Sequence, residues 1–91
     1  MQTFRLITER ELADFSAALR ASGWSERDFE LQEDVFDPRE AEVETATGQL
    51  GVRCLRTEAV EVYRLGPGFE WAADFKADLQ RGKFGVAPPA P

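Results

Sequence analysis

Carboxylates are the residues best able to do chemistry in this chain, and they gather in one segment. Residues 26–44 hold nine acids and two bases, a net charge of −7, whereas all 91 residues together have a net charge of −6. In an alternating strand pattern, one solvent-facing side of this segment shows Glu30, Asp34, Glu42 and Glu44. These four acids are the candidate binding site.

Three hypotheses account for the four acids. The first is a solvated face that keeps a small domain soluble and protects a sheet edge from pairing. The second is a docking surface for a basic protein partner. The third is a site for a hard cation such as Ca²⁺, although the spacing and central glycine of a calcium loop are absent. A turn at Thr47 and Gly48 would place Arg53 opposite Glu42, where its positive charge would offset part of the repulsion between the acids.

Other chemistry is limited by what the chain lacks. It contains no histidine and one cysteine, so histidine-based triads, thiolate metal cages and Cys-x-x-Cys redox pairs are excluded. No glycine-rich nucleotide-binding motif is present. Cys54 lies in phase with apolar neighbours, which indicates a small buried residue rather than a reactive thiol. We therefore expect no enzyme activity, no metal site and no cofactor.

The length and composition limit the classes of protein to which the chain can belong. The length suits one domain, which we expect over residues 1–86, followed by a disordered proline-rich tail over residues 87–91. Apolar runs are too short to span a membrane, and a single cysteine is typical of a reducing compartment, so the expected location is cytoplasmic. The acidic balance argues against nucleic-acid binding, because such binding requires a basic face.

The first predicted helix has the clearest boundaries. Thr8 and Glu11 form a capping-box pattern, and Gly23 is typical of a left-handed helix end, so a helix is expected over residues 9–22. Residues 3–6 alternate before it and predict a short strand.

Four further strands are expected, at residues 29–35, 41–46, 50–54 and 60–65. For the second of these, a short helix capped by Asp37 is the alternative.

Glu33 shares the parity of the apolar Leu31 and Val35, so a bulge or a strand end is expected there. In the last strand, Val60 and Val62 are expected on the core side.

A second helix is expected over residues 69–81, with an apolar stripe of Trp71, Phe75 and Leu79. The predicted order is β-α-β-β-β-β-α. This order indicates an α+β two-layer sandwich, in which both helices cover one face of a mostly antiparallel sheet of four to five strands.

Residues 63–85 carry a glycine and aromatic pattern. It consists of Tyr63-Arg64-Leu65-Gly66-Pro67-Gly68, the helix with Trp71, Phe75 and Leu79, and Gly82-Lys83-Phe84-Gly85. The pattern resembles that of a group of short, uncharacterised bacterial proteins, some of which are described as transcriptional regulators. No binding residues follow from this resemblance, and neither predicted helix is basic along one face as a recognition helix is.

Together these patterns favour a non-catalytic protein-binding or regulatory module whose partner has a basic surface. A homodimer through a sheet edge or the second helix is one candidate arrangement. The alternative is a transcriptional regulator that contacts DNA directly, which predicts binding with a steep dependence on salt.

Overall fold

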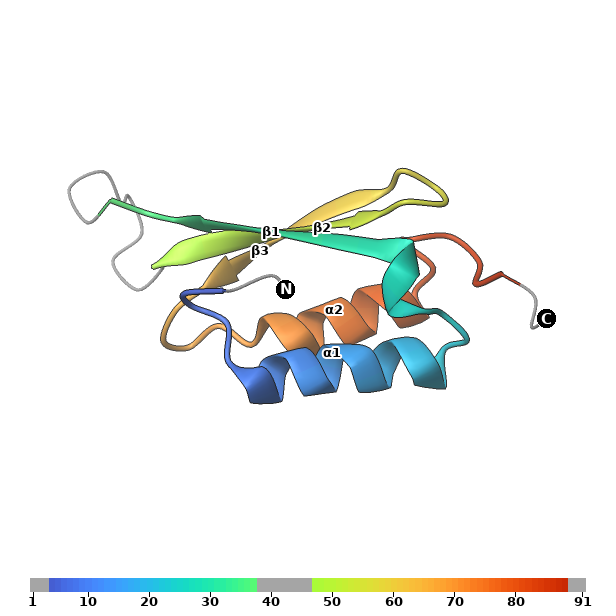
Figure 1. The fold of residues 1–91 in the computed structure, drawn as a ribbon, viewed down its shortest axis with the longest axis horizontal. Helices are drawn as coiled ribbons and strands as arrows, with labels where there is room; N and C mark the ends of the chain where they lie inside the picture. Colours follow the sequence, from blue (N-terminus) through green and yellow to red (C-terminus); the bar gives the residue numbers. More distant parts are fainter. Residues whose placement is uncertain (1–3, 38–46, 89–91) are drawn as a thin grey trace.

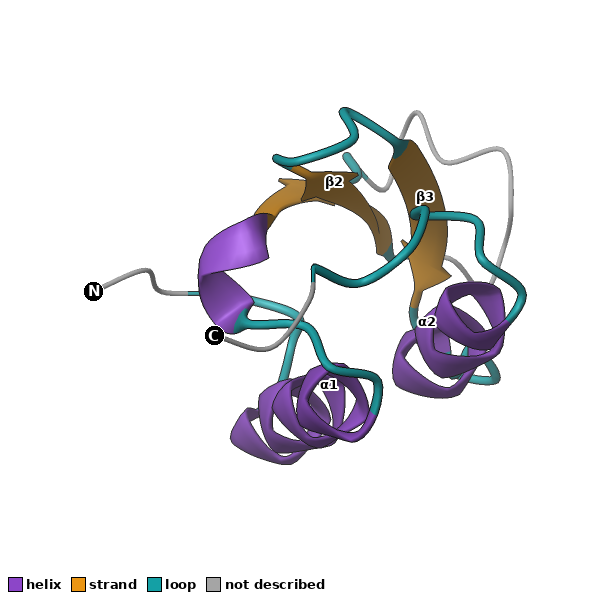
Figure 2. Cartoon of the chain, turned by 90° about the vertical axis from the view of Figure 1, so that its right-hand side faces the viewer, coloured by secondary structure: helices purple, strands orange, loops and turns teal. Residues whose placement is uncertain are grey.

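The computed structural model describes residues 4–37 and 47–88, and within them the chain forms two layers (Figures 1 and 2). A three-stranded antiparallel sheet is one layer, and two helices lie side by side on one of its faces. The elements are α1 (Glu9–Ala21), the 3-10 helix η1 (Glu26–Asp28), β1 (Phe29–Val35), β2 (Gly48–Cys54), β3 (Val60–Leu65) and α2 (Trp71–Gln80). The predicted α+β architecture is confirmed, with three strands among the described residues.

The boundaries of α1 arise from local hydrogen bonds, as the sequence predicts. The Thr8 hydroxyl accepts a bond from the Glu11 amide at 3.1 Å, and the Glu11 carboxylate accepts one from the Thr8 amide at 2.9 Å. After the helix, Gly23 has a φ of 82°, a conformation that glycine adopts without strain.

A buried carboxylate joins η1 to the segment that follows β2. Asp28 is buried, and its carboxylate accepts bonds from the Ser25 amide at 3.0 Å and the Arg56 Nε at 2.7 Å. The bond from Arg56, followed by that from Ser25, lowers the pKa of Asp28 below its ordinary value. This residue therefore favours the folded state while it is ionised.

Asp28→Asn is expected to flatten the acid side of the stability profile. Because the pKa of Asp28 is lower in the folded state, its contribution is present above the unfolded pKa of about 4 and is lost as pH falls through the folded pKa. Urea unfolding from about pH 5 to pH 2 should show a smaller loss of stability for Asp28→Asn than for wild type. Asp14→Asn, which removes an exposed carboxylate, is the control and should follow wild type. Parallel profiles for Asp28→Asn and wild type would contradict this role.

The strand order is β1-β2-β3, and every neighbouring pair is antiparallel. Leu31 lies opposite Val52, and Leu50 lies opposite Tyr63, so these side chains share the face that meets the helices. The core between the layers is largely aromatic, and Phe75 of α2 is fully buried at its centre.

The start of the chain differs from the prediction. Residues 4–6 do not form a strand, because the amides of Arg5 and Leu6 donate to the Glu33 carboxylate at 2.7 and 2.8 Å. The bulge considered at Glu33 is also absent, since this residue pairs in regular register with Leu50. An inward-facing charge is thus satisfied by backbone amides instead of by a distortion of the strand.

The turn predicted at Thr47 and Gly48 is wrong. Gly48 is a strand residue that lies opposite both Val35 and Leu65, so β1 and β2 pair directly with each other. The expected strand over residues 41–46, and its helical alternative, lie outside the described residues.

The side chains of β3 point to the opposite sides of the sheet from those expected. Val60 and Val62 lie on the side away from the helices, each 55% exposed, whereas Tyr63 and Leu65 are buried. The larger side chains take the core positions because they bury more apolar area.

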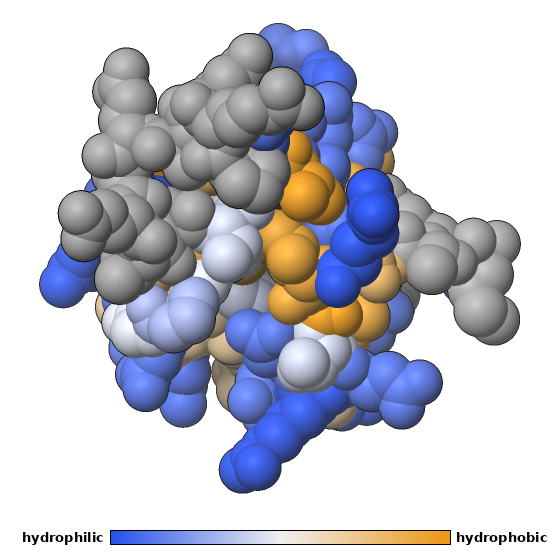
Figure 3. Space-filling model, turned by 90° about the vertical axis from the view of Figure 1, so that its left-hand side faces the viewer, coloured by the Kyte–Doolittle hydropathy of each residue, from blue (hydrophilic) through white to orange (hydrophobic). Residues whose placement is uncertain are grey.

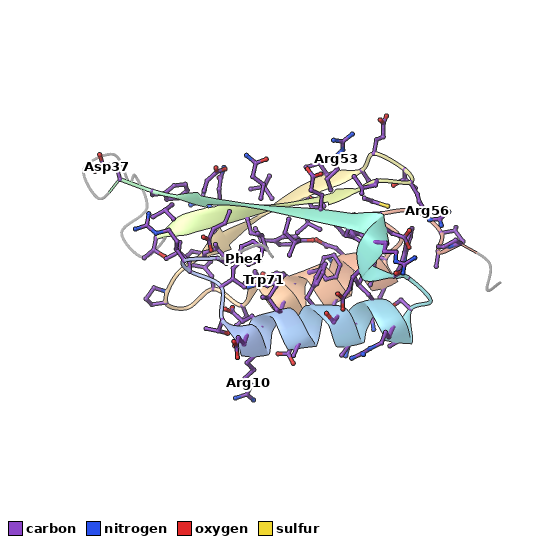
Figure 4. All side chains as sticks on the ribbon, in the orientation of Figure 1. Phe4, Arg10, Asp37, Arg53, Arg56 and Trp71 are labelled. Carbon is purple, nitrogen blue, oxygen red and sulfur yellow. The ribbon has the colours of Figure 1, made fainter. Side chains whose placement is uncertain are left out.

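Helix α2 follows a glycine-rich loop. Gly68 has a φ of 87°, and the helix begins at Trp71, two residues later than predicted. Its predicted stripe of Trp71, Phe75 and Leu79 is buried, as expected. Trp71 lies between the layers (Figure 4), and its indole N–H has no hydrogen-bond partner among the described residues.

Candidate protein-binding site

The face of the sheet opposite the helices is not covered by any described element (Figure 1). We call it the open face, and Arg53 projects from it away from the helices (Figure 4). The strand register arranges its side chains as three rows of three. The rows are Glu30, Arg53 and Val60; Gln32, Gly51 and Val62; and Asp34, Gln49 and Arg64.

Two of the four predicted site residues lie on the open face. Glu30 and Asp34 are exposed on β1, about 13 Å apart along the strand. Glu42 and Glu44 lie outside the described residues, so the grouping of all four acids stays a prediction.

The charge of Glu30 is not neutralised within the described part of the chain. Arg53 lies opposite Glu30, not opposite Glu42 as the predicted turn implied, because β1 pairs directly with β2. The Arg53 guanidinium nevertheless contacts Glu58, at 3.6 Å. No ion pair joins Glu30 to another described residue, which leaves its carboxylate available to a partner.

The other end of β1 is also acidic, and it carries a weak hydrogen bond. Asp34 accepts from the Gln49 amide at 3.4 Å, a long distance for such a bond. Arg64 lies in the same row, two strands away. The open face is therefore acidic along β1 and basic along parts of β2 and β3, rather than acidic throughout.

Exposed valines complete the open face, and sequence reasoning missed them. Val60 and Val62 form an apolar strip on β3, and Gly51, which has no side chain, lies opposite Val62. The sequence does contain a signal for the exposure of the valines. Tyr63 and Leu65 alternate with Val60 and Val62 along the strand, so only one of the two sets can face the core, and the set with the larger side chains is the one that is buried.

Apolar surface is also exposed at the end of the sheet where β1 finishes (Figure 3), and Val35 there is 45% exposed.

A metal site requires several ligating side chains close together, and a reactive thiol requires exposure. Residues 4–37 and 47–88 contain no group of three or more histidine, cysteine or acidic side chains arranged to hold a metal ion. Cys54, the last residue of β2, is a free thiol whose side chain is fully buried, in agreement with its predicted packing role. None of the described helices has the length and apolar character needed to cross a membrane.

A polar cluster between β3 and α2 is structural. The Tyr63 hydroxyl donates to the Asp78 carboxylate at 2.8 Å, and Asp78 also contacts Lys83 at 3.5 Å and Arg81 at 3.6 Å. Burial, followed by the bond to Asp78, raises the pKa of Tyr63 well above its ordinary value. A phenol that resists ionisation is a poor nucleophile or base, so this cluster holds β3 against α2.

Tyr63→Phe is expected to lower the free energy of unfolding at neutral pH by about 1–2 kcal/mol, because it removes a buried bond to a charged group. Since folding raises the pKa of Tyr63, its contribution is present below the unfolded pKa of about 10 and is lost as pH rises above it. The variant should therefore lose less stability than wild type at alkaline pH, as measured by urea unfolding.

Direct titration provides a second measurement, because Tyr63 is the chain's one tyrosine. Ultraviolet absorbance of its phenolate should appear only as the protein unfolds in alkali. Ionisation near pH 10 with the fold intact would contradict the buried hydrogen bond.

Comparison with known proteins gives no assignment. No protein-family model matches the chain, and neither a curated protein nor a solved structure shows significant similarity to it.

Proposed function

We propose that this chain is a non-catalytic protein-binding module whose open face receives a partner with a basic surface. One observation carries the proposal: Val60 and Val62, each 55% exposed, share a helix-free face with Glu30, whose carboxylate forms no ion pair with another described residue. Exposed apolar side chains beside unpaired charge are typical of surfaces that a protein partner covers.

The solubility hypothesis explains the acids but not the valines. Val60 and Val62 favour the strand conformation even in water, but only a partner that covers them removes their apolar area from water. Covering the exposed half of each valine contributes about 1 kcal/mol to binding. Glu30 and Asp34 would then accelerate association with a basic partner and fix its orientation.

Direct contact with DNA is the alternative left by the sequence, and the open face gives it little support. Its two arginines, Arg53 and Arg64, share the face with the acids Glu30 and Asp34, and Arg53 contacts Glu58 as well. A DNA-binding face needs several cations that can neutralise phosphates.

Photo-crosslinking in the native cell tests the proposal. A benzophenone amino acid at Gln32, in the middle row of the open face, should yield an adduct with a specific protein. The same group at Ala13, which is exposed on α1, is the control and should not yield that adduct. Equal labelling from both positions, or adducts with nucleic acid, would overturn the proposal.

The acids themselves are expected to serve binding rather than stability. Replacing Glu30, Asp34, Glu42 and Glu44 with glutamine should leave the free energy of unfolding unchanged within about 0.5 kcal/mol or raise it, because removing four acids reduces the excess negative charge of the chain and the two described ones are exposed. Thermal melting in metal-free buffer measures this. A large drop in Tm would show that the carboxylates are paired internally or bind a cation that the fold needs.

A further inference from the structure

Strand β3 has one paired edge and one open edge. The Cys54 amide donates to the Ala59 carbonyl at 2.8 Å, and the register continues in steps of two along the strand. The backbone groups of residues 59, 61, 63 and 65 therefore face β2, whereas those of Val60, Val62 and Arg64 face away from it. No other described segment pairs with this second edge.

The two edges of the sheet differ in how far the described residues cover them. On β1, the inward-facing carboxylate of Glu33 binds the amides of Arg5 and Leu6, which brings residues 4–6 alongside that strand. None of the described residues covers β3 in this way, and the strand contains no proline and follows a regular register with β2. An uncovered, regular edge with exposed valines is a template for pairing with another strand.

The surface next to this edge belongs to α2, which lies beneath β3 (Figure 2). Between them is a groove of about 370 Å³ whose lining includes Val62 and Ala77. Asp74 and Arg81 also line it. Asp74 lies on α2 and Arg81 directly follows the helix, about one helical turn to either side of Ala77, so an acid and a base flank this small residue. Glu61, Asp78 and Lys83 also line the groove, and Lys83 contacts Asp78 at 3.5 Å and Glu61 at 3.9 Å.

We infer that this edge of β3 pairs with the same edge of a second copy of the chain. A two-fold axis near Val62 and Ala77 would run β3 antiparallel to its counterpart and α2 antiparallel to its counterpart. Asp74 then meets Arg81 of the second copy, and Arg81 meets Asp74 of the second copy. Such reciprocal contact is what an isologous interface requires.

The charge pattern favours a second copy over an unrelated peptide. An acid and a base placed on opposite sides of a small residue complement themselves after a two-fold rotation, whereas a foreign strand would need charges of its own to match both. Arg81 contacts Asp78 at 3.6 Å, but its side chain is 69% exposed, so it can exchange this weak surface pair for one across the interface.

Dimerisation in this way joins two sheets into one of six strands and brings the valine strips of the two open faces together. Glu30 and Asp34 lie on β1, the strand farthest from the axis, and stay accessible. The inference is therefore independent of the proposed function, and it is tested with the purified chain alone.

Sedimentation of the purified chain at concentrations from roughly micromolar to millimolar is the first measurement. Wild type should pass from monomer to dimer over this range. Val62→Pro removes an amide that faces the open edge and leaves the bonds to β2 in place, so it should abolish the dimer. Val62→Thr keeps the amide and is the matched control, expected to dimerise as wild type does.

Charge variants test the interface without changing the backbone. Asp74→Arg alone, or Arg81→Asp alone, places like charges opposite each other twice and should weaken self-association about tenfold. An equimolar mixture of the two variants places opposite charges at both positions and should form a heterodimer about as tight as the wild-type dimer. Circular dichroism of each variant verifies that it is folded.

Three results would overturn the inference. The first is a wild type that stays monomeric throughout the range, including one that instead binds an extended peptide. The second is a dimer that persists unchanged in Val62→Pro and in both charge variants. The third is a mixture of the charge variants that associates no better than either variant alone. If Val62→Pro fails to fold, the charge variants still decide the question.

Discussion

Replacing Phe75 with alanine is expected to lower the free energy of unfolding by about 3–5 kcal/mol. The Phe75 ring is fully buried, with its centroid 4.7 Å from that of Phe15 on α1, 5.8 Å from Phe29 on β1 and 5.3 Å from Phe84. Its removal would leave a cavity where the two layers meet. Since a chain of this length has about 5–14 kcal/mol of stability, the loss should be evident in urea or thermal unfolding.

Phe69→Ala is the matched control for this substitution. Phe69 is only partly buried in the loop before α2 and does not belong to the core cluster, so its loss should cost less than about 1 kcal/mol. Equal costs for the two variants would mean that the aromatic cluster does not hold the layers together.

Gly48→Ala should also destabilise the fold strongly, by on the order of 2–3 kcal/mol. A Cβ added at Gly48 would collide with the backbone carbonyl oxygen of Asp34 and would lie 2.6 Å from Cδ1 of Leu6. The Leu6 side chain can move, but the carbonyl belongs to β1. The substitution would therefore force β1 and β2 apart at the end where Asp34 lies.

Gly51→Ala on the same strand is a control with the same chemical change. The nearest atom to a Cβ added there is the Gln32 carbonyl oxygen at 3.7 Å, an ordinary van der Waals distance. Chemical denaturation should therefore show little or no loss of stability for this variant. Similar losses for Gly48→Ala and Gly51→Ala would contradict the close approach of β1 at Gly48.

The parts of the fold that depend on near neighbours in the chain were predictable. The α1 cap needs only Thr8 and Glu11, and the helix end needs only Gly23, so each can be read from a few consecutive residues. The aromatic stripe of α2 follows from helical spacing alone.

The errors occur where a residue has two candidate environments that only distant contacts can distinguish. Glu33 pairs regularly because the amides of residues 5 and 6 satisfy its carboxylate, and no feature of its own segment indicates that partner. Likewise, Val60 and Val62 fit a core face as well as Tyr63 does. Tyr63 takes the core position because its ring buries more apolar area, and its hydroxyl can be buried there only because Asp78 of α2 accepts its hydrogen bond.

Only the part of the candidate site that depends on local alternation was predictable. Alternation along β1 is local, and it correctly placed Glu30 and Asp34 on one exposed face. The cross-strand neighbour of Glu30 depends on which strand pairs with β1 and in which register. That pairing is set by contacts between β1 and β2, which are distant in the sequence. The predicted turn therefore places Arg53 opposite Glu42, whereas the structure places it opposite Glu30.

The central claim is that the acids and valines of the open face together form a binding surface. Calorimetric titration of the partner captured at Gln32 tests it most directly, with Glu30→Gln/Asp34→Gln and Val60→Thr/Val62→Thr as the variants. Each double variant should bind about tenfold more weakly than wild type while its Tm is little changed. Glu9→Gln/Asp14→Asn, which removes two acids from α1, is the control and should keep wild-type affinity. Equal affinity for all four proteins would contradict the claim.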